Sequence, residues 1–433
     1  MRAGEGLFWL MRRRTTRARP PYLSDVRRLL LVRLDKLGDV VLTTPFLREI
    51  RRNLPDALIT LVVRPMCFEL VERCPYVNRV LVFDCHAGRD RGAQTRRRVQ
   101  MMRMARSELW PRHFDLAIVP RWDTDLYDAS FLAYWSGASW RAGFSESTTL
   151  PKKHQNAGFD RLFTQVFSGE ARQHEVEHNL DVIRFLGGTV ESDRLEVWTS
   201  PEDDAFAAAA LKAVGGTSGP HVIAFGVGAG EPKNVWPLAH FGQLGSRLKA
   251  TVGARIVVVG GPGEEPLGRE LQRQLGTHVL NLTGAATLRQ TAAVLRSCNL
   301  FVGNDSGQMH LAAAAGIPVV GVSCHPLDGS PIHEKSPARF GTWRVPSVGV
   351  QPETARNPCS EACTADAAHC ILNVSVQEVE KAVKTLLQRT AGGPTAELSA
   401  GQDIQEVPAA KWTLSAAQRQ TAQAPDRRIP KPA

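Results

Sequence analysis

The stretch from residue 301 to residue 321 constrains the fold more than any other part of the chain. A short apolar run leads into a polar Gly-Asn-Asp-Ser-Gly turn, then a helix-like segment, and then Gly316-Ile317-Pro318 before the next apolar run. This order predicts strand, turn, helix and strand. In such a unit the turn lies at the carboxyl end of the first strand, where the free N–H groups of a new helix can hold a phosphate. Taken alone, Asp305 and Ser306 are better explained as helix-capping residues.

The same alternation of strand-like and helix-like segments runs through most of the chain. In the amino-terminal half we expect strands at 29–34, 58–63, 80–83 and 114–119, and a helix over 40–50 with Pro45 in its first two turns. After a linker placed near 188–205, a second series runs from a strand at 221–225 to a helix at 376–388. Nearly continuous apolar strands that alternate with helices indicate parallel sheets covered on both faces. The sequence therefore predicts an α/β protein with two doubly wound, Rossmann-like domains, at 29–190 and 205–390, which enclose a cleft.

Two terminal segments fall outside these domains. Residues 1–28 carry eight arginines and are predicted to be a flexible basic arm, while 391–433 is rich in Ala, Gln, Thr and Pro and is predicted to be disordered. The whole chain has 53 Lys and Arg against 43 Asp and Glu, so we expect an anionic partner. No apolar run approaches the roughly 18 residues of a membrane span, and no secretory signal is recognisable. These features predict a soluble, cytoplasmic protein that can rest on a membrane surface.

Arginine also recurs within the first domain, where the segment 96–110 mixes five arginines with valine, methionine and leucine. Such a composition is typical of an amphipathic basic helix that meets a membrane or an anionic substrate. An ordinary solvated helix face explains the pattern at least as well.

Eight cysteines are spread irregularly along the chain, and we expect them to be reduced. Cys359, Cys363, His369 and Cys370 lie close together in the sequence and could hold zinc. Their spacing is not of the paired C-x-x-C kind, however, and His369 directly precedes Cys370. The pattern therefore favours free thiols over a metal site.

Three glycine-bearing turns of the second domain are predicted to meet at one edge of its sheet. They are Gly226–Gly230, which Lys233 follows, then Gly260–Gly263, and then the turn of the opening stretch. Glycines let a phosphate approach the backbone, and a lysine supplies a compensating charge. Together these turns predict a site for a nucleotide diphosphate. The chain has neither the G-x-x-x-x-G-K-[ST] motif of P-loop enzymes nor a G-x-G-x-x-G fingerprint after the first strand.

In the first domain the matching strand end carries Gly38 and Asp39. A carboxylate at the start of a helix is stabilised by the helix dipole, so a capping role for Asp39 is one interpretation. The other is a general base that faces the second domain and takes a proton from a hydroxyl. Asp35 and Lys36 are close enough to be rivals or helpers.

Several motifs taken together carry a family resemblance. They are LLLVRLDKLGDVVLTTPFLREI at 29–50, Lys233 with Val235-Trp236-Pro237, Leu282-Thr283-Gly284, GNDSGQMHLAAAAGIP at 303–318, Ser336–Gly341 and the cysteine-bearing segment 358–370. Over about residues 29–390 the chain resembles the ADP-heptose:lipopolysaccharide heptosyltransferases of glycosyltransferase family nine. The resemblance implies a GT-B architecture, with the acceptor on the amino-terminal domain and the nucleotide sugar on the carboxyl-terminal one. It also implies an inverting, metal-independent transfer without a cofactor.

The resemblance assigns roles to individual residues on both sides of the cleft. Asp39 matches the family's catalytic aspartate, which deprotonates the acceptor hydroxyl, and Lys233 matches the lysine that binds the donor phosphate. The segment that contains Asp305, Ser306, Gly307 and His310 matches the one around the ribose and the diphosphate. Better-known members have threonines at places that here read Gly228, Ala229 and Gly230, so backbone amides must hold the phosphate there.

Arg121 and Arg141 are candidates for gripping an anionic, lipid-linked saccharide acceptor, although each one taken alone is better explained as a structural or surface arginine. The sequence thus predicts transfer of heptose from ADP-heptose to the lipopolysaccharide core at the cytoplasmic face of the inner membrane. Another nucleotide sugar or another acceptor is the alternative. A non-catalytic protein that binds anions or nucleic acid is a remote one, because the aromatic content is only 7% and no base-stacking motif occurs.

Overall fold

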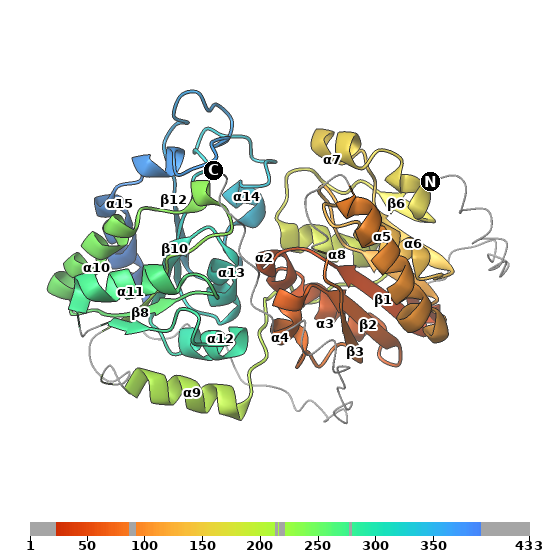
Figure 1. The fold of residues 1–433 in the computed structure, drawn as a ribbon, viewed down its shortest axis with the longest axis horizontal. Coiled ribbons are helices and arrows are strands. Elements are labelled where there is room, and N and C mark those ends of the chain that lie inside the picture. Colours follow the sequence, from red (N-terminus) through yellow and green to blue (C-terminus); the bar gives the residue numbers. More distant parts are fainter. Residues whose placement is uncertain (1–22, 86–91, 213–214, 216–220, 277–278, 391–433) are drawn as a thin grey trace.

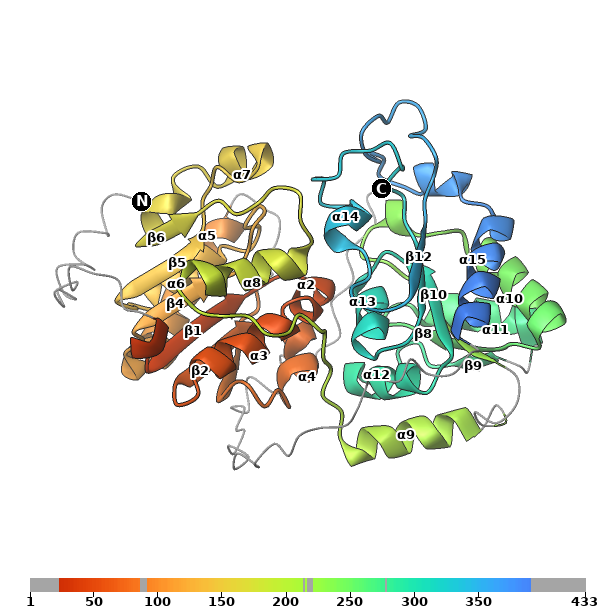
Figure 2. The ribbon, with the colours of Figure 1, turned by 180° about the vertical axis from the view of Figure 1, so that it is seen from behind.

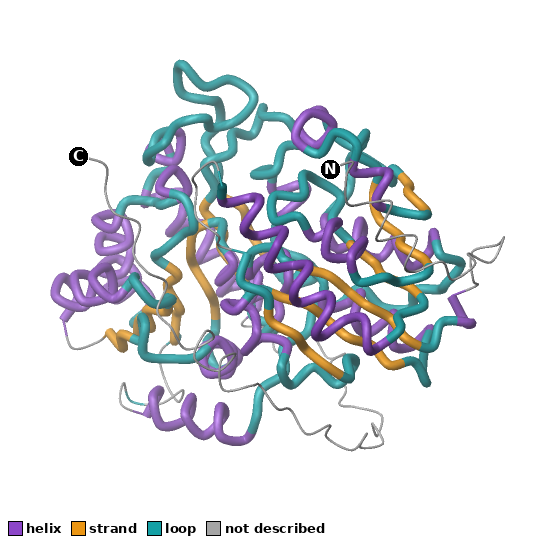
Figure 3. Tube along the Cα trace, turned by 45° about the vertical axis from the view of Figure 1, so that its right-hand side comes forward, coloured by secondary structure: helices purple, strands orange, loops and turns teal. Residues whose placement is uncertain are grey.

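A computed structural model describes residues 23–85, 92–212, 215, 221–276 and 279–390. These residues form two α/β domains side by side, each built on a six-stranded parallel sheet with helices on both faces (Figure 1, Figure 3). Most of the predicted basic arm and the whole predicted tail lie outside the described residues. The described end of the arm belongs to the fold, because Leu23 and Val26 are buried in the first domain's core.

The first sheet has the strand order β3-β2-β1-β4-β5-β6, which is the doubly wound order predicted from the alternation of elements. The residues of β1 are buried after its first position, as expected for a central strand covered on both faces. The strands are β1 (Arg28–Arg33), β2 (Leu58–Val63), β3 (Arg79–Val82), β4 (Leu116–Val119), β5 (Trp140–Phe144) and β6 (Gln165–Phe167). The α-helices are α2 (Leu37–Val41), α3 (Thr44–Asn53), α4 (Phe68–Val71), α5 (Ala93–Met104), α6 (Ala129–Trp135), α7 (Leu150–Gln155) and α8 (Glu175–Phe185).

The second sheet repeats this topology with the order β12-β11-β10-β7-β8-β9. Its strands are β7 (Val222–Gly226), β8 (Arg255–Val259), β9 (Val279–Asn281), β10 (Leu300–Asn304), β11 (Val319–Val322) and β12 (Ser347–Val350). Its helices are α9 (Pro201–Lys212), α10 (Leu238–Val252), α11 (Glu265–Leu275), α12 (Leu288–Arg296), α13 (Gly307–Ala314), α14 (Pro337–Phe340) and α15 (Val376–Thr390), with the 3-10 turns η6 (Pro232–Asn234) and η8 (Cys370–Asn373). The stretch that opened the sequence analysis forms β10, a turn, α13 and β11, as predicted.

The helix predicted over 40–50 is two helices rather than one. α2 ends at Val41, and α3 begins at Thr44 with Pro45 in its first turn. Pro45 has no N–H to donate to a preceding carbonyl, so it starts a helix more easily than it continues one. The hydroxyl groups of Thr43 and Thr44 donate instead to the carbonyl oxygens of Asp39 and Val41, at 2.7 and 2.8 Å.

The predicted linker is an ordered strap. From residue 189 onwards the chain runs extended along α3, where Arg48 donates to the carbonyl of Ser192 at 2.9 Å and Arg52 pairs with Glu191 at 2.8 Å. It then crosses to α9, which packs on α12 beneath the second domain (Figure 2). Helix α9 begins at Pro201, so the second domain starts slightly earlier than the predicted residue 205.

The basic segment predicted over 96–110 is helical, as α5 followed by a π-helical turn at Ala105–Leu109. Met101 packs inwards, while Val99 and Met102 are exposed. Arg97 and Arg98 both form ion pairs with the buried carboxylate of Asp128, at 2.5 and 2.9 Å. These two arginines therefore stabilise the domain itself. Among the described residues, no helix is long and apolar enough to cross a membrane.

Candidate active site

The two domains touch where α2, after β1, meets α13, after β10 (Figure 1). Two glycines allow this close approach. A Cβ atom added to Gly38 would lie 2.7 Å from Cδ2 of His310, and one added to Gly307 would lie 2.9 Å from Cβ of Leu37. Neither glycine has a positive φ, so lack of space rather than backbone conformation requires glycine here. The contact brings α2, which carries Asp39, close to the turn before α13, which carries Asp305.

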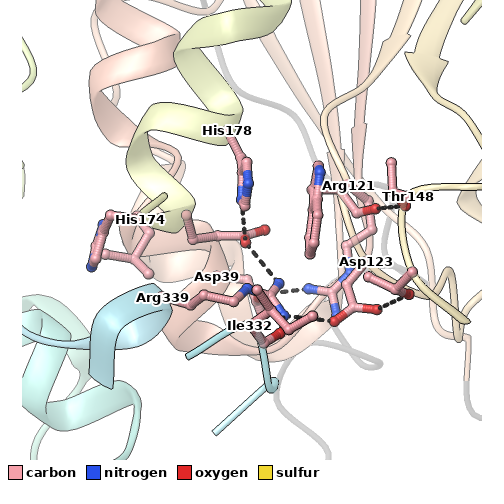
Figure 4. Close-up of polar contacts among 12 residues, drawn as sticks. Asp39, Arg121, Asp123, Thr148, His174, His178, Ile332 and Arg339 are labelled. Atoms are coloured by element: carbon pink, nitrogen blue, oxygen red, sulfur yellow. Dashed lines mark hydrogen bonds and ion pairs between the residues drawn. The ribbon is translucent and has the colours of Figure 1, made fainter. Parts of the chain in front are cut away.

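The carboxylate of Asp39 is held by two arginines of its own domain. Nη1 of Arg121, just beyond β4, donates to Oδ1 of Asp39 at 2.7 Å, and Nη2 of Arg33 lies 3.7 Å from the same oxygen (Figure 4). Asp35 lies 3.6 Å from Arg121, and burial raises the pKa of Asp35 although both arginines oppose the shift. Both arginine contacts go to Oδ1, so they fix the orientation of the Asp39 carboxylate.

Behind Asp39 lies a buried network of charges that crosses the domain boundary. Arg339 belongs to α14 of the second domain, and its side chain is fully buried. It reaches into the first domain, where its guanidinium pairs with Asp123 at 2.9 Å and with Glu175 at 3.2 Å (Figure 4). Its guanidinium also lies 4.6 Å from the ring centroid of Trp122. Burial works to raise the pKa of Glu175, but the hydrogen bond with His178 and the charge of Arg339 hold that pKa well below its ordinary value. Arg339 therefore ties the two domains together next to the candidate base.

On the side of the second domain, three lysines surround one carboxylate. Glu231 accepts from Lys335 at 2.8 Å and from Lys36 of the other domain at 3.1 Å, and Lys233 lies 3.5 Å away. Although burial opposes it, the hydrogen bonds from Lys335 and Lys36 hold the pKa of Glu231 down at about 2. Three ammonium groups around a single carboxylate leave an excess of positive charge, which suits a diphosphate.

The turn between β10 and α13 supplies polar groups beside these lysines. Burial raises the pKa of Asp305 to about 6, with Lys335 opposing the shift, and burial lowers the pKa of His310 to about 4, so His310 is neutral at pH 7. Within the described part of the chain, the buried Ser306 Oγ and His310 Nδ1 have no hydrogen-bond partner. Buried polar atoms are almost always paired in proteins, so these two atoms are available to a ligand.

Glu264, which follows β8, was not predicted as a site residue. Its side chain lies over the glycine turns: a Cβ added to Gly228 would clash with the Glu264 carboxylate, and one added to Gly260 would lie 2.5 Å from its Oε2. Gln308 and the backbone N–H of Gly261 both donate to that oxygen, each at 3.1 Å. An acidic residue after the second strand of a Rossmann-like domain was the signal that could have identified it.

The sequence profile of glycosyltransferase family 9 (heptosyltransferase) matches residues 102–326, which is more than half of the chain. The chain belongs to glycosyltransferase family 9. A relative is lipooligosaccharide heptosyltransferase 2 of Haemophilus ducreyi, 24% identical over 302 residues that make up 67% of this chain and 81% of that protein. Among solved structures, the family 9 glycosyl transferase of Veillonella parvula matches with a TM-score of 0.69 at 23% identity. The match covers 84% of this chain and 98% of the V. parvula chain. The ADP-heptose lipopolysaccharide heptosyltransferase II of E. coli has a TM-score of 0.60 at 19% identity, with coverages of 84% and 99%.

Family membership makes this protein a glycosyltransferase, and the structural likenesses confirm the predicted GT-B fold. The described structure places the predicted residues Asp39, Lys233, Asp305, Ser306, Gly307 and His310 along one domain contact, with Gly228 at the neighbouring strand end. Arg121 also lies there, but its guanidinium is bonded to Asp39 rather than open to an acceptor.

Arg141 does not fit the role predicted for this glycosyltransferase. It is the second residue of β5, at the amino-terminal end of that strand, whereas α2 follows the carboxyl-terminal end of β1; Arg141 is also buried. Its guanidinium donates to the carbonyl oxygens of Leu162 at 2.6 Å and Ala138 at 2.9 Å, and burial lowers its pKa to about 10. Arg141 therefore fastens a loop, and the acceptor role is not retained for it.

Proposed function

We propose that this family 9 glycosyltransferase moves a heptose from ADP-heptose to the inner core of lipopolysaccharide, with Asp39 as the general base. The names of the H. ducreyi relative and of the E. coli structure support the donor and the acceptor class. The observation that carries the proposal is the position of Asp39 in α2, which contacts α13, while Lys36, three positions earlier, reaches Glu231 in the lysine-rich turn of the other domain.

The proposed reaction is a single displacement. The acceptor hydroxyl oxygen attacks the anomeric carbon of heptose, its proton passes to Oδ2 of Asp39, and the bond from the anomeric carbon to the diphosphate oxygen breaks, so that ADP leaves. The new bond forms on the face opposite to the leaving group, so the configuration inverts. Arg121 and Arg33 hold Oδ1 and thereby orient Oδ2 for the transfer, which is the geometric requirement for a general base.

The departing diphosphate gains negative charge, and preorganised positive groups at that point lower the barrier. Lys233, Lys335 and Lys36 are proposed to bind it together with the amide groups at the start of α13. These three lysines supply the charge in a metal-independent transfer. The carboxylates of Glu264 and Asp305 are proposed to bind hydroxyl groups of the ribose or the heptose, the role that acidic residues after Rossmann strands play for a nucleotide ribose.

The amino-terminal domain is proposed to hold the acceptor at the cytoplasmic face of the inner membrane. Support comes from the outer face of α5 and its continuation, where Arg103 and Arg106 are exposed beside Val99 and Met102. Basic and apolar side chains on one helix face suit an anionic lipid surface.

Changing Asp39 to Asn tests the base. The change keeps the size of the side chain but removes the proton acceptor, so turnover should fall by about 10²–10⁴-fold. Affinity for ADP should be retained, because Asp39 belongs to the other domain. The exposed Asp56 supplies the matched control, Asp56→Asn, which should leave turnover unchanged. Turnover of Asp39→Asn within a factor of two of the wild type would contradict the assignment.

The donor is tested separately, by thermal shift with ADP-, UDP- and GDP-sugars. We expect ADP-heptose to give the largest stabilisation. A larger shift with a UDP- or GDP-sugar would replace the proposed donor while leaving the role of Asp39 intact.

A further inference from the structure

We propose that Cys359, Cys363, His369 and Cys370 form a structural zinc site. Their ligand atoms all lie within 4.8 Å of one another. The Nδ1 atom of His369 is 3.6 Å from Sγ of Cys359 and 3.5 Å from Sγ of Cys370. Around a tetrahedral zinc ion, with Zn–S of about 2.3 Å and Zn–N of about 2.0 Å, sulfur and nitrogen atoms stand about 3.6 Å apart. These two nitrogen–sulfur distances match those of a Cys₃His site, although the sequence spacing argued against one.

The surroundings of the sulfur atoms also suit a metal. All three cysteines are free thiols and are buried in the core of the second domain. The backbone N–H of Thr364 points at Sγ of Cys359 and that of Arg356 at Sγ of Cys370, each at 3.4 Å. Donors of this kind around the ligand atoms orient thiolates and stabilise their negative charge in metal sites.

The loop that carries the cluster needs a cross-link. Between β12 and η8, residues 351–369 contain neither helix nor strand. Irregular loops longer than about 12–15 residues are uncommon in compact domains unless they are functional. A zinc ion bound by four side chains would supply the stability that such a loop lacks, because binding free energy at a structural zinc site is also folding free energy.

The loop in turn supports the donor side of the interface. Turn η8, which begins at Cys370, packs on η6, which carries Lys233. The carbonyl of Glu361 accepts from the N–H of Ser330 at 2.9 Å, within the segment that leads to Lys335. Loss of the metal should therefore disturb two of the three lysines proposed to bind the diphosphate, a consequence that rests on the proposed function. The zinc site itself does not depend on it.

The chemistry of the four ligand side chains favours some metal ions over others. Three thiolates and one imidazole are soft to borderline ligands, which favour zinc over the oxygen-seeking magnesium and calcium ions. Binding would release the thiol protons, since the thiolate is the form that coordinates.

The test is the metal content of the full-length purified chain, measured by inductively coupled plasma mass spectrometry. We expect about one zinc ion per chain, and an at least ten-fold lower content in Cys363→Ser and Cys370→Ser. The matched control is Cys298→Ser, a buried cysteine of the same domain whose thiol donates to the carbonyl of Val294, and it should keep its zinc.

Cobalt exchange provides a readout that does not depend on the variants being stable. Wild-type protein loaded with Co²⁺ should show the intense visible bands of a tetrahedral cobalt thiolate, and zinc should abolish them. Wild-type protein without stoichiometric metal and without these bands would overturn the proposal, as would a disulfide between two of the three cysteines in the native protein. These measurements need no donor or acceptor, so their failure is distinct from a failure of the glycosyltransferase assignment.

Discussion

Replacing Arg339 with methionine should destabilise the protein severely, because it removes the cation that pairs directly with both of two buried carboxylates. Methionine fills a similar volume, so the main loss is the pairing with Asp123 and Glu175 at 2.9 and 3.2 Å. Glu175 is fully buried and Asp123 nearly so. Breaking a buried pair by removing one partner costs about 3–5 kcal/mol. At roughly 2–4 °C per kcal/mol for a domain of this size, the melting temperature should fall by roughly 6–20 °C.

The stability lost in Arg339→Met should depend on pH, and the direction of that dependence follows from the pKa shifts of the two carboxyls. Despite burial, Arg339 helps to hold the pKa of both Asp123 and Glu175 below their ordinary values. Carboxylates with depressed pKa values contribute stability above their unfolded pKa values of about 4 and lose it as the pH falls. In Arg339→Met that contribution is missing, so the difference in stability between wild type and variant should be full at pH 7 and should shrink as the pH falls below about 4.

Differential scanning calorimetry at a series of pH values measures this difference. The matched control is Arg344→Met, since Arg344 pairs with Asp193 of the other domain at 2.6 Å in the same segment but is largely exposed. An exposed pair contributes about 0–1 kcal/mol, so this variant should melt within a few degrees of the wild type. If Arg339→Met cost no more than Arg344→Met, or if its penalty did not change with pH, the network would not have the energetic role assigned to it.

Two further substitutions probe the domain contact. Gly38→Ala places a Cβ atom 2.7 Å from the buried ring of His310, so overpacking of about 1–3 kcal/mol should separate the domains and lower kcat/KM roughly 5- to 150-fold. Gly349→Ala, whose added Cβ would meet no atom closer than 4.0 Å, should match the wild type, and equal activity of both variants would contradict the tight fit. Asp305→Asn should raise the melting temperature at pH 8 but not at pH 4, because burial raises the pKa of Asp305 from 3.8 to about 6, so its ionisation costs stability as the pH rises through that window. The same variant should bind the donor more weakly, and a stability gain that did not depend on pH would refute this account.

Much of the fold follows from local patterns that the sequence carries openly. Continuous apolar runs separated by helical segments determine parallel, doubly wound sheets, because only strands buried on both faces can be apolar throughout. Glycine turns at strand ends predicted the proposed donor side, since the carboxyl ends of parallel strands share one edge. Pro45 shows the limit of this reasoning: the apolar period continues through it, and only the backbone hydrogen bonds reveal two helices.

The sequence by itself therefore determined the two-domain architecture, the family, and the strand ends that carry Asp39, Lys233 and Asp305. Only the tertiary structure decided which charges meet. Arg121 binds Asp39 from 82 positions away, and Arg339 crosses from one domain into the core of the other. The four ligand atoms around His369 converge although their spacing argued against a metal site. Secondary structure is set by neighbours in the chain, whereas pairing of charges and ligands depends on distances in space, which local sequence patterns do not encode.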